Sequence, residues 1–290
     1  MKNHINRLVT TAQLVVVCGM GLILMSCGDG GDGPIPSANA QSTGRDFVAP
    51  VVFQAAGPDL ASIQNTVDQH RAALGLTNNG NNPGPLADGR REINWDGGGS
   101  TTTVTGTPLI NFQVTRGALF TTTGTGFVQA PVAGLATTFN NPTYETIFQP
   151  FSPQRLFSPI NSNVTETLFF VPGPGAETKP AKTRGFGVIF SDVDLPDGSG
   201  PGDKNGNRQA STRIECFSTD GGLLFSSFIP ASPGDKSVSF LGIVFTDARI
   251  AKVRITSGDA VPGPNDDEKH DIVMMDDFLY GEPQPIQPIP

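Results

Sequence analysis

Short segments in which apolar and polar residues alternate recur along this chain, above all in its second half, and turn-forming residues separate them. A two-residue period is typical of strands with one buried face. The turn Thr219-Asp220-Gly221-Gly222 is a strong hairpin signal, and 35 Gly and 25 Pro fit many short strands. This pattern predicts a mostly β fold, an antiparallel β-sandwich of jelly-roll type with long loops. We expect strands at residues 92–95, 109–115, 118–122, 146–150, 164–171, 185–192, 211–218, 223–229, 237–245, 251–256 and 271–280.

One N-terminal amphipathic helix is expected at about residues 58–74. Leu60, Ile63, Val67 and Leu74 recur at helical spacing, and Gly75 is suited to end the helix. Two later segments, 186–190 and 272–275, are apolar on both faces. They should be interior strands, covered by the opposite sheet on one side and by the helix or a long loop on the other.

The composition divides the chain into segments. Residues 28–45 contain Gly, Pro, Ser and Asp with almost no bulky apolar side chain, and the end of the chain has a Pro at every second or third position. We expect a signal peptide at 1–26, a flexible tether at 27–45, an N-terminal extension with the helix at 46–89, the β-sandwich at 90–282 and a Pro-rich tail at 283–290.

The first residues have the features of an export signal. Lys2 and Arg7 precede an apolar run that is too short to span a membrane comfortably. The run ends in Leu24-Met25-Ser26-Cys27, which resembles the lipobox of bacterial lipoproteins. The resemblance implies cleavage before Cys27, lipidation of its thiol and anchoring to a lipid bilayer. The alternative is an ordinary signal with a coincidental cysteine. Gly28, where Asp would resemble an inner-membrane retention signal, favours the outer membrane or cell surface.

Cleavage would change the charge and the cysteine content. Without Lys2 and Arg7 the 19 basic side chains become 17 against 27 acidic ones, a formal charge of −10. Such an acidic chain is not expected to bind nucleic acid, which requires clustered Lys and Arg. With Cys18 removed and Cys27 acylated, only Cys216 keeps a thiol, so no intramolecular disulfide is expected. Cys216 should pack as a small apolar residue in a strand.

From about residue 90 the chain resembles a group of uncharacterised secreted bacterial β-sandwich proteins. The residues that carry the resemblance lie at 90–97, 148–152, 183–187 and 273–282. The resemblance implies a β-sandwich outside the cytoplasm and implies no particular activity.

A long acidic loop is the first candidate site. Asp203, Asn205 and Asn207 have the spacing of the first three ligands of a calcium-binding EF-hand loop, but Arg208 and Ile214 stand where that loop needs Gly and Glu. A looser structural Ca²⁺ site remains a hypothesis, and the alternative is a solvated loop of turn formers. The hypothetical ligands are Asp192, Asp194, Asp197, Asp203, Asn205 and Asn207.

Two adjacent carboxylates, Asp276 and Asp277, interrupt an apolar strand. Because successive side chains of a strand face opposite ways, at least one should point toward packed surface and need a partner. The candidate partners are Arg184, Arg254, backbone amides or Ca²⁺, with Asp277 as a further hypothetical metal ligand.

Residues 92–96 offer two further hypotheses. Glu92 and Asp96 superficially resemble the acid pair of jelly-roll glycoside hydrolases, but residues four apart on a strand are about 13 Å apart, whereas retaining hydrolases need about 5 Å. Trp95 is the only Trp and could stack on a sugar ring or belong to the core.

The expected function is therefore a non-catalytic binding or surface-structural module, with glycan or matrix binding as the leading hypothesis. No serine-hydrolase elbow, zinc-protease motif, phosphate-binding loop or dinucleotide fingerprint is present in the sequence, so an enzyme is not favoured. The alternatives are a carbohydrate-active hydrolase of jelly-roll type and a subunit of a cell-envelope assembly, which would bind an envelope protein.

Overall fold

The computed structural model describes residues 49–195, 212–264 and 270–286. The helices are α1 (Leu60–Leu74), α2 (Gln113–Arg116), α3 (Val132–Phe139), α4 (Tyr144–Ile147) and the 3₁₀ turn η1 (Asp96–Gly98). The strands are β1 (Val51–Gly57), β2 (Arg90–Ile93), β3 (Thr103–Gly106), β4 (Ala118–Thr121), β5 (Gly126–Ala130), β6 (Leu156–Ile160), β7 (Val164–Phe169), β8 (Ala181–Lys182), β9 (Gly185–Ser191), β10 (Arg213–Phe217), β11 (Leu223–Phe228), β12 (Val238–Val244), β13 (Lys252–Thr256), β14 (Met274–Gly281) and β15 (Gln284–Pro285).

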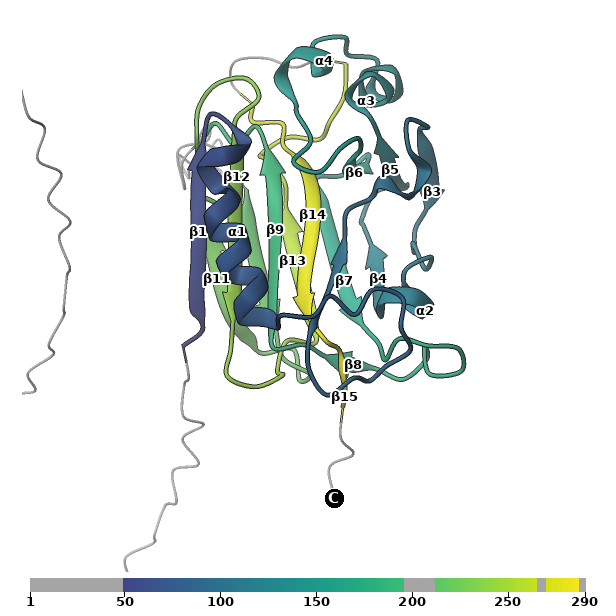
Figure 1. Ribbon diagram of the computed structural model, residues 1–290. Helices are drawn as coiled ribbons and strands as arrows, with labels where there is room; N and C mark the ends of the chain where they lie inside the picture. Colours follow the sequence, from purple (N-terminus) through teal and green to yellow (C-terminus); the bar gives the residue numbers. More distant parts are fainter. Residues whose placement is uncertain (1–48, 196–211, 265–269, 287–290) are drawn as a thin grey trace, which may run out of the picture. The chain divides into compact units, whose positions relative to one another are not determined.

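Two antiparallel sheets pack face to face (Figure 1). The eight-stranded sheet has the order β1-β12-β9-β14-β6-β5-β3, with β2 beside the second half of β14. The five-stranded sheet has the order β11-β10-β13-β7-β4. The short pair β8 and β15 forms a separate ribbon.

The strand pairing is that of a jelly roll. β6 pairs with β14, β7 with β13, β9 with β12 and β10 with β11, all antiparallel. The strands β6, β7, β9 and β10 thus form one side of a long two-sided ribbon, and β11, β12, β13 and β14 form the returning side. Rolling this ribbon up puts the first and third pairs in the larger sheet and the second and fourth in the smaller one. The predicted fold class is confirmed.

An aromatic core fills the space between the sheets. The ring of Trp95 lies parallel to that of Phe157, with centroids 3.8 Å apart, and meets Phe120 and Phe278 edge to face. The indole N–H donates to the carbonyl of Asp276 at 3.0 Å, which satisfies the one polar atom of the buried side chain. Cys216 is buried in the same core as a free thiol, as expected.

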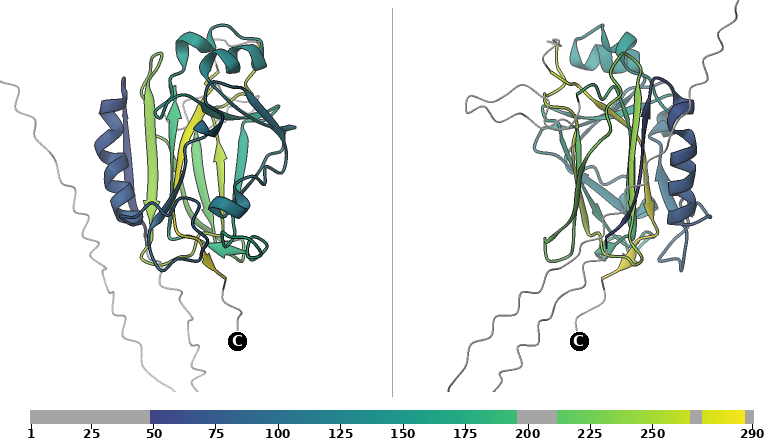
Figure 2. Two further views of the ribbon diagram at one scale, coloured as in Figure 1. Left: turned by 45° about the vertical axis from the view of Figure 1, so that its right-hand side comes forward. Right: turned by 90° about the vertical axis from the view of Figure 1, so that its left-hand side faces the viewer.

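The predicted helix is present as α1 and covers the outer face of the larger sheet (Figure 2, right). Asp59 caps its N-terminus by accepting from the Ser62 N–H at 3.0 Å, and Gly75 ends it. The buried stripe of the helix and the sheet residues beneath it form one apolar cluster, Ile63, Val67, Leu74, Ile189, Val238, Phe240, Val244 and Leu279. The expectation that β9 and β14 are interior strands is confirmed, because every residue in both is buried.

Two expected strands are helical. In place of a strand at 109–115 the chain forms α2, which ends at Gly117 with a left-handed φ of 71°. In place of a strand at 146–150 it forms α4, where Tyr144 and Phe148, one helical turn apart, pack into a satellite core with α3. Tertiary packing therefore overrides the local strand pattern in both segments.

The expected boundaries at residues 90 and 283 do not divide the fold. β1 pairs along its whole length with β12, so the N-terminal extension contributes an edge strand to the larger sheet. β15, which lies within the expected Pro-rich tail, pairs with β8. Over its described residues, the chain from residue 49 onward forms one compact unit.

Candidate functional site

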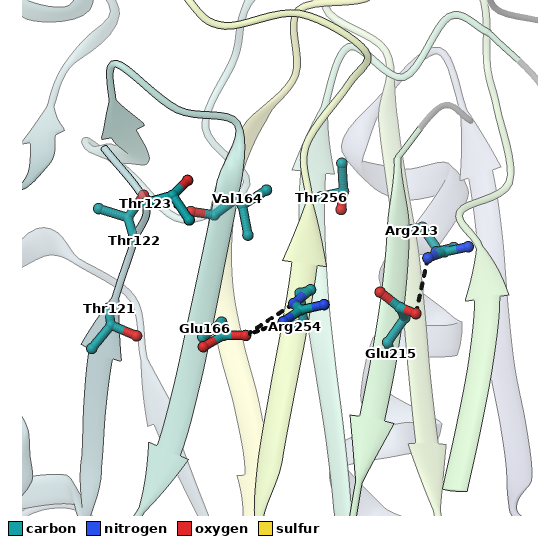
Figure 3. Close-up of a pocket in the computed structure, with 9 residues that line it drawn as sticks. All are labelled: Thr121, Thr122, Thr123, Val164, Glu166, Arg213, Glu215, Arg254 and Thr256. Carbon is teal, nitrogen blue, oxygen red and sulfur yellow. Dashed lines mark hydrogen bonds and ion pairs between the residues drawn. The ribbon is translucent and has the colours of Figure 1, made fainter. Parts of the chain in front are cut away.

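A hollow of about 520 Å³ lies on the outer face of the five-stranded sheet (Figure 3). We call it the sheet groove. Four neighbouring strands, β4, β7, β13 and β10, contribute its floor. All but one of its lining residues are polar or charged, and the lining consists of Thr121, Thr122, Thr123, Val164, Glu166, Arg213, Glu215, Arg254 and Thr256.

Strand alternation places these side chains on the open face. In β7, β13 and β10 every second residue, including Thr165, Ile255 and Ile214, is buried toward the core, and the residues between them face outward. The strand register then sets the outward residues in rows. One row crosses five strands in the order Thr121, Glu166, Arg254, Glu215 and Ser226.

Two ion pairs hold the charged side chains of the sheet groove in place. Arg254 donates from Nε and Nη2 to one carboxylate oxygen of Glu166, at 2.9 and 2.7 Å, and Lys252 reaches the same oxygen at 3.3 Å. Arg213 pairs with Glu215 at 2.9 Å. Partial burial opposes ionisation of Glu166, but its bonds to Arg254 and Lys252 outweigh this effect and lower its pKa.

Two aromatic rings flank the charged row. The Lys252 ammonium lies 4.8 Å from the centroid of Phe217, and the Arg254 guanidinium carbon lies 5.8 Å from it. The guanidinium of Arg213 lies 6.0 Å from the centroid of Phe228. Both rings are half-buried, so part of each reaches the surface. The hydrogen-bonding groups of the sheet groove thus have partly exposed aromatic rings beside them.

Of the residues of the sheet groove, only Arg254 was singled out from the sequence, and in another role, as a candidate partner of Asp276 and Asp277. Glu166, Arg213 and Arg254 lie in three strands that are far apart along the chain, and only strand pairing brings them together. The alternating pattern of each strand showed that these positions face away from the core. It did not show which strands are neighbours.

Trp95 is not exposed and cannot serve as a sugar-stacking platform. Its side chain is 2% exposed, with aromatic rings packed around it. Stacking on a ligand needs a free ring face. The alternative that we gave for this residue, a core tryptophan, is the one observed.

The hypothetical calcium ligands are only partly described. Asp197, Asp203, Asn205 and Asn207 lie outside the described residues. Asp192 is buried with a left-handed φ of 70°, and Asp194 accepts a hydrogen bond from the Gly234 N–H at 2.7 Å. Among the described residues, no group of three or more His, Cys, Asp or Glu side chains could hold a metal ion.

The two carboxylates Asp276 and Asp277 lie at a β-bulge in β14. They stand between Met275 and Phe278, opposite the single residue Ile189 of β9. Both are buried. An extra residue in a strand changes where side chains point, and here it directs two carboxylates to the segment that precedes β6.

This bulge binds the 151–155 segment. Asp276 accepts from the backbone N–H groups of Phe151 and Ser152, and Asp277 accepts from the Ser152 hydroxyl at 2.7 Å. Arg71 of α1 lies 3.4 Å from the other Asp277 oxygen. Backbone amides were among the expected partners, but the arginine is Arg71 and not Arg184 or Arg254.

The pKa values of the bulge carboxyls differ from those of exposed acids. Burial raises the pKa of Asp276 well above its ordinary value, and the negative charge of Asp277 adds to the effect. Burial also raises the pKa of Asp277, against the opposing hydrogen bond from Ser152 and the charge of Arg71. The arrangement is that of a buried structural pair.

Comparison with known proteins found no matching protein family, no matching curated protein and no matching solved structure. Within the described ranges, no helix is both long and apolar enough to cross a membrane. The lipobox around Cys27 lies outside the described residues.

Proposed function

We propose that this protein is a non-catalytic binding module whose sheet groove takes a hydroxyl-rich ligand, with a glycan as the favoured class. The observation that carries the proposal is the difference between the two sheets. The helix α1 covers the outer face of the larger sheet, whereas no helix in the described ranges packs on the outer face of the smaller one (Figure 2). A concave, uncovered face with fixed polar groups is a common form of ligand site.

The chemistry of the sheet groove suits sugar hydroxyls, which both donate and accept hydrogen bonds. Glutamate oxygens only accept, guanidinium groups only donate, and threonine hydroxyls do both. Glu166 and Glu215 each have one oxygen to which no described residue donates, so these oxygens are free for a ligand. Phe217 and Phe228 add partly exposed rings on which the apolar face of a sugar could pack.

Export and lipid anchoring complete the proposal. The lipobox ending at Cys27 supports attachment of the acylated protein to the outer membrane or cell surface, and residues 28–45 would serve as the tether. A glycan-binding domain on such a tether could attach the cell to a polysaccharide or matrix.

Neither a hydrolase nor a calcium requirement is part of the proposal. A glycoside hydrolase needs a general acid with a raised pKa, whereas the pKa of Glu166 is lowered. The described part of the chain offers too few grouped carboxylates for calcium. If no glycan binds, the remaining hypothesis is that the protein is a subunit of a cell-envelope assembly.

A glycan array probed with the full chain tests the proposal. We expect binding by the wild type and loss of signal in Arg254→Gln. Arg249→Gln is the matched control, because Arg249 also binds one carboxylate oxygen, of Asp247, through Nε and Nη2, and its guanidinium carbon lies 5.1 Å from the centroid of Phe245. A signal that survives Arg254→Gln would place the ligand elsewhere.

A further inference from the structure

A second, smaller hollow of about 170 Å³ lies where β2, η1, α2 and β5 come together. We call it the arginine pocket. Its lining includes two guanidinium groups, two aromatic rings, a glycine and an amide, contributed by Arg116, Arg155, Trp95, Phe112, Gly98 and Gln129. None of these residues belongs to the sheet groove.

Arg155 is a buried cation without an ion pair. The residue is 2% exposed, and its Nη2 donates to the Gln129 carbonyl at 2.8 Å. Its Nε is buried and has no hydrogen-bond partner. No carboxylate of the described residues lies within ion-pair distance of its guanidinium. A buried charge in this state is costly unless a counter-ion joins it.

Arg116, the second guanidinium, is also bound only by neutral oxygens. Its Nε donates to the Glu92 backbone carbonyl at 3.1 Å, and its Nη1 to the side-chain oxygen of Asn81. Burial is the main cause that lowers the pKa of both Arg116 and Arg155. Within the described ranges, neither arginine has a carboxylate partner.

The nearby carboxylates are already occupied. Glu92 also lines the pocket, but its two oxygens bind Arg90 at 2.6 Å and Arg71 at 3.1 Å. Asp96 accepts from the backbone N–H groups of Gln154 and Arg155 at 2.7 and 2.9 Å, and its other oxygen lies 3.0 Å from the Ser152 hydroxyl oxygen. Asp96 and Glu92 attract the guanidinium groups of Arg155 and Arg116 from a distance, but no described carboxylate forms an ion pair with either group.

We propose that the arginine pocket binds the carboxylate group of a small organic acid. A planar guanidinium matches a planar carboxylate and can donate two parallel hydrogen bonds to it. The half-buried ring of Phe112 supplies an apolar wall for a short carbon chain or ring attached to that group, and the buried ring of Trp95 lies beside it at a centroid distance of 5.3 Å. The volume is sufficient for an acid of a few carbon atoms.

Trp95 gives a direct readout, because it is the only tryptophan of the chain and lines the pocket. Sodium acetate is titrated into the full chain while tryptophan emission is recorded, with sodium chloride at equal ionic strength as the control. We expect a saturable change with acetate and none with chloride. The proposal is overturned if acetate gives no saturable change or if chloride reproduces it. Tighter binding of sulfate than of acetate would overturn the carboxylate assignment.

A pair of glycine variants then locates the site. A Cβ added at Gly98 would lie 2.1 Å from Nη1 of Arg155, so Gly98→Ala must displace the guanidinium. A Cβ added at Gly106 of β3, which does not line the pocket, would meet no atom within 4 Å, which makes Gly106→Ala the matched control. We expect Gly98→Ala to raise the acetate Kd about tenfold or more and Gly106→Ala to leave it unchanged.

Arg116→Gln gives a second, independent test, because Arg116 is half-buried and its loss threatens the fold less. We expect this variant also to raise the acetate Kd about tenfold, while its unfolding curve stays cooperative. Wild-type affinity in both Arg116→Gln and Gly98→Ala would refute the proposal. If Gly98→Ala does not fold, the Arg116→Gln result alone decides.

Discussion

Asp271 is a buried carboxyl whose charge state should change near neutral pH. It is 3% exposed, and its main described hydrogen bond comes from the Asp194 N–H at 3.2 Å. Burial is the main cause that raises its pKa to about 7, and the charges of Asp194 and Asp259 add to it. The folded protein therefore holds this proton more tightly than the unfolded chain, in which the pKa is near 3.8.

The sign of the resulting pH dependence follows from this difference. Between about pH 4 and pH 7 the folded state binds more protons, so the contribution of Asp271 to the free energy of unfolding falls as pH rises. The shift sets an upper limit of roughly 4 kcal/mol on this contribution. We expect Asp271→Asn to remove it, as measured by urea unfolding from pH 4 to pH 8. A difference between wild type and variant that does not change with pH would contradict this account.

His70 should act in the opposite direction. It lies between Phe53 and Phe240, at centroid distances of 5.4 and 5.3 Å, and burial lowers its pKa to about 3. The unfolded chain, with a histidine pKa near 6.5, then binds the proton more tightly. The contribution of His70 is fully present above pH 6.5 and is lost as pH falls toward 3.

His70→Leu keeps an apolar side chain at this position and removes the titration. We expect the wild type to lose stability relative to His70→Leu below pH 6.5, by an amount that grows toward an upper limit of roughly 5 kcal/mol. Thermal unfolding of both proteins across this range measures the effect. Parallel curves for the two proteins would show that His70 does not titrate in this way.

At the scale of elements, the bulge in β14 connects three parts of the fold. Asp276 and Asp277 bind the 151–155 segment, and Asp277 also contacts α1 through Arg71. Asp276→Ala would leave the buried N–H groups of Phe151 and Ser152 without an acceptor, at a cost of about 2–4 kcal/mol. Asp276→Asn keeps one acceptor and should cost much less. Chemical denaturation measures the free energy of unfolding of both variants. Equal losses of stability in Asp276→Ala and Asp276→Asn would show that these hydrogen bonds do not determine the stabilising effect of Asp276.

Elements with an unambiguous period could be predicted from the sequence, and others could not. The helix α1 has a continuous apolar stripe with a cap at each end, and β9 is apolar on both faces. In contrast, α3 contains Gly, Val and Thr, which have low helix propensity, and its packing against Tyr144 and Phe148 stabilises it. The edge strand β1 depends on β12, which is far away along the chain.

The partners of the bulge carboxylates were predicted in part, for a similar reason. Two carboxylates in an apolar strand indicated that partners must exist, because a buried charge needs them. Their identity depended on the position of Ser152 and Arg71, which come from other elements. Trp95 was ambiguous in the same way, since a single Trp is more often a core residue but can also lie on a binding surface, and only its neighbours decide.

At the scale of the whole molecule, the jelly roll has two unequal outer faces. The face of the larger sheet is closed by α1, and the face of the smaller sheet presents rows of Thr, Glu and Arg from strands that only the rolled topology brings together. The sequence predicted the sandwich and the direction of most outward side chains. The groups that meet on the open face could not be predicted, because they depend on the order of the strands in the sheet, and local periodicity does not specify that order.

The measurement that tests the ligand surface most directly is isothermal titration of the full chain with the strongest glycan from the array. We expect Arg254→Gln to weaken binding by about tenfold or more, and Arg249→Gln to bind as the wild type does. Equal affinity in wild type and Arg254→Gln would contradict the assignment of the ligand to the outer face of the five-stranded sheet.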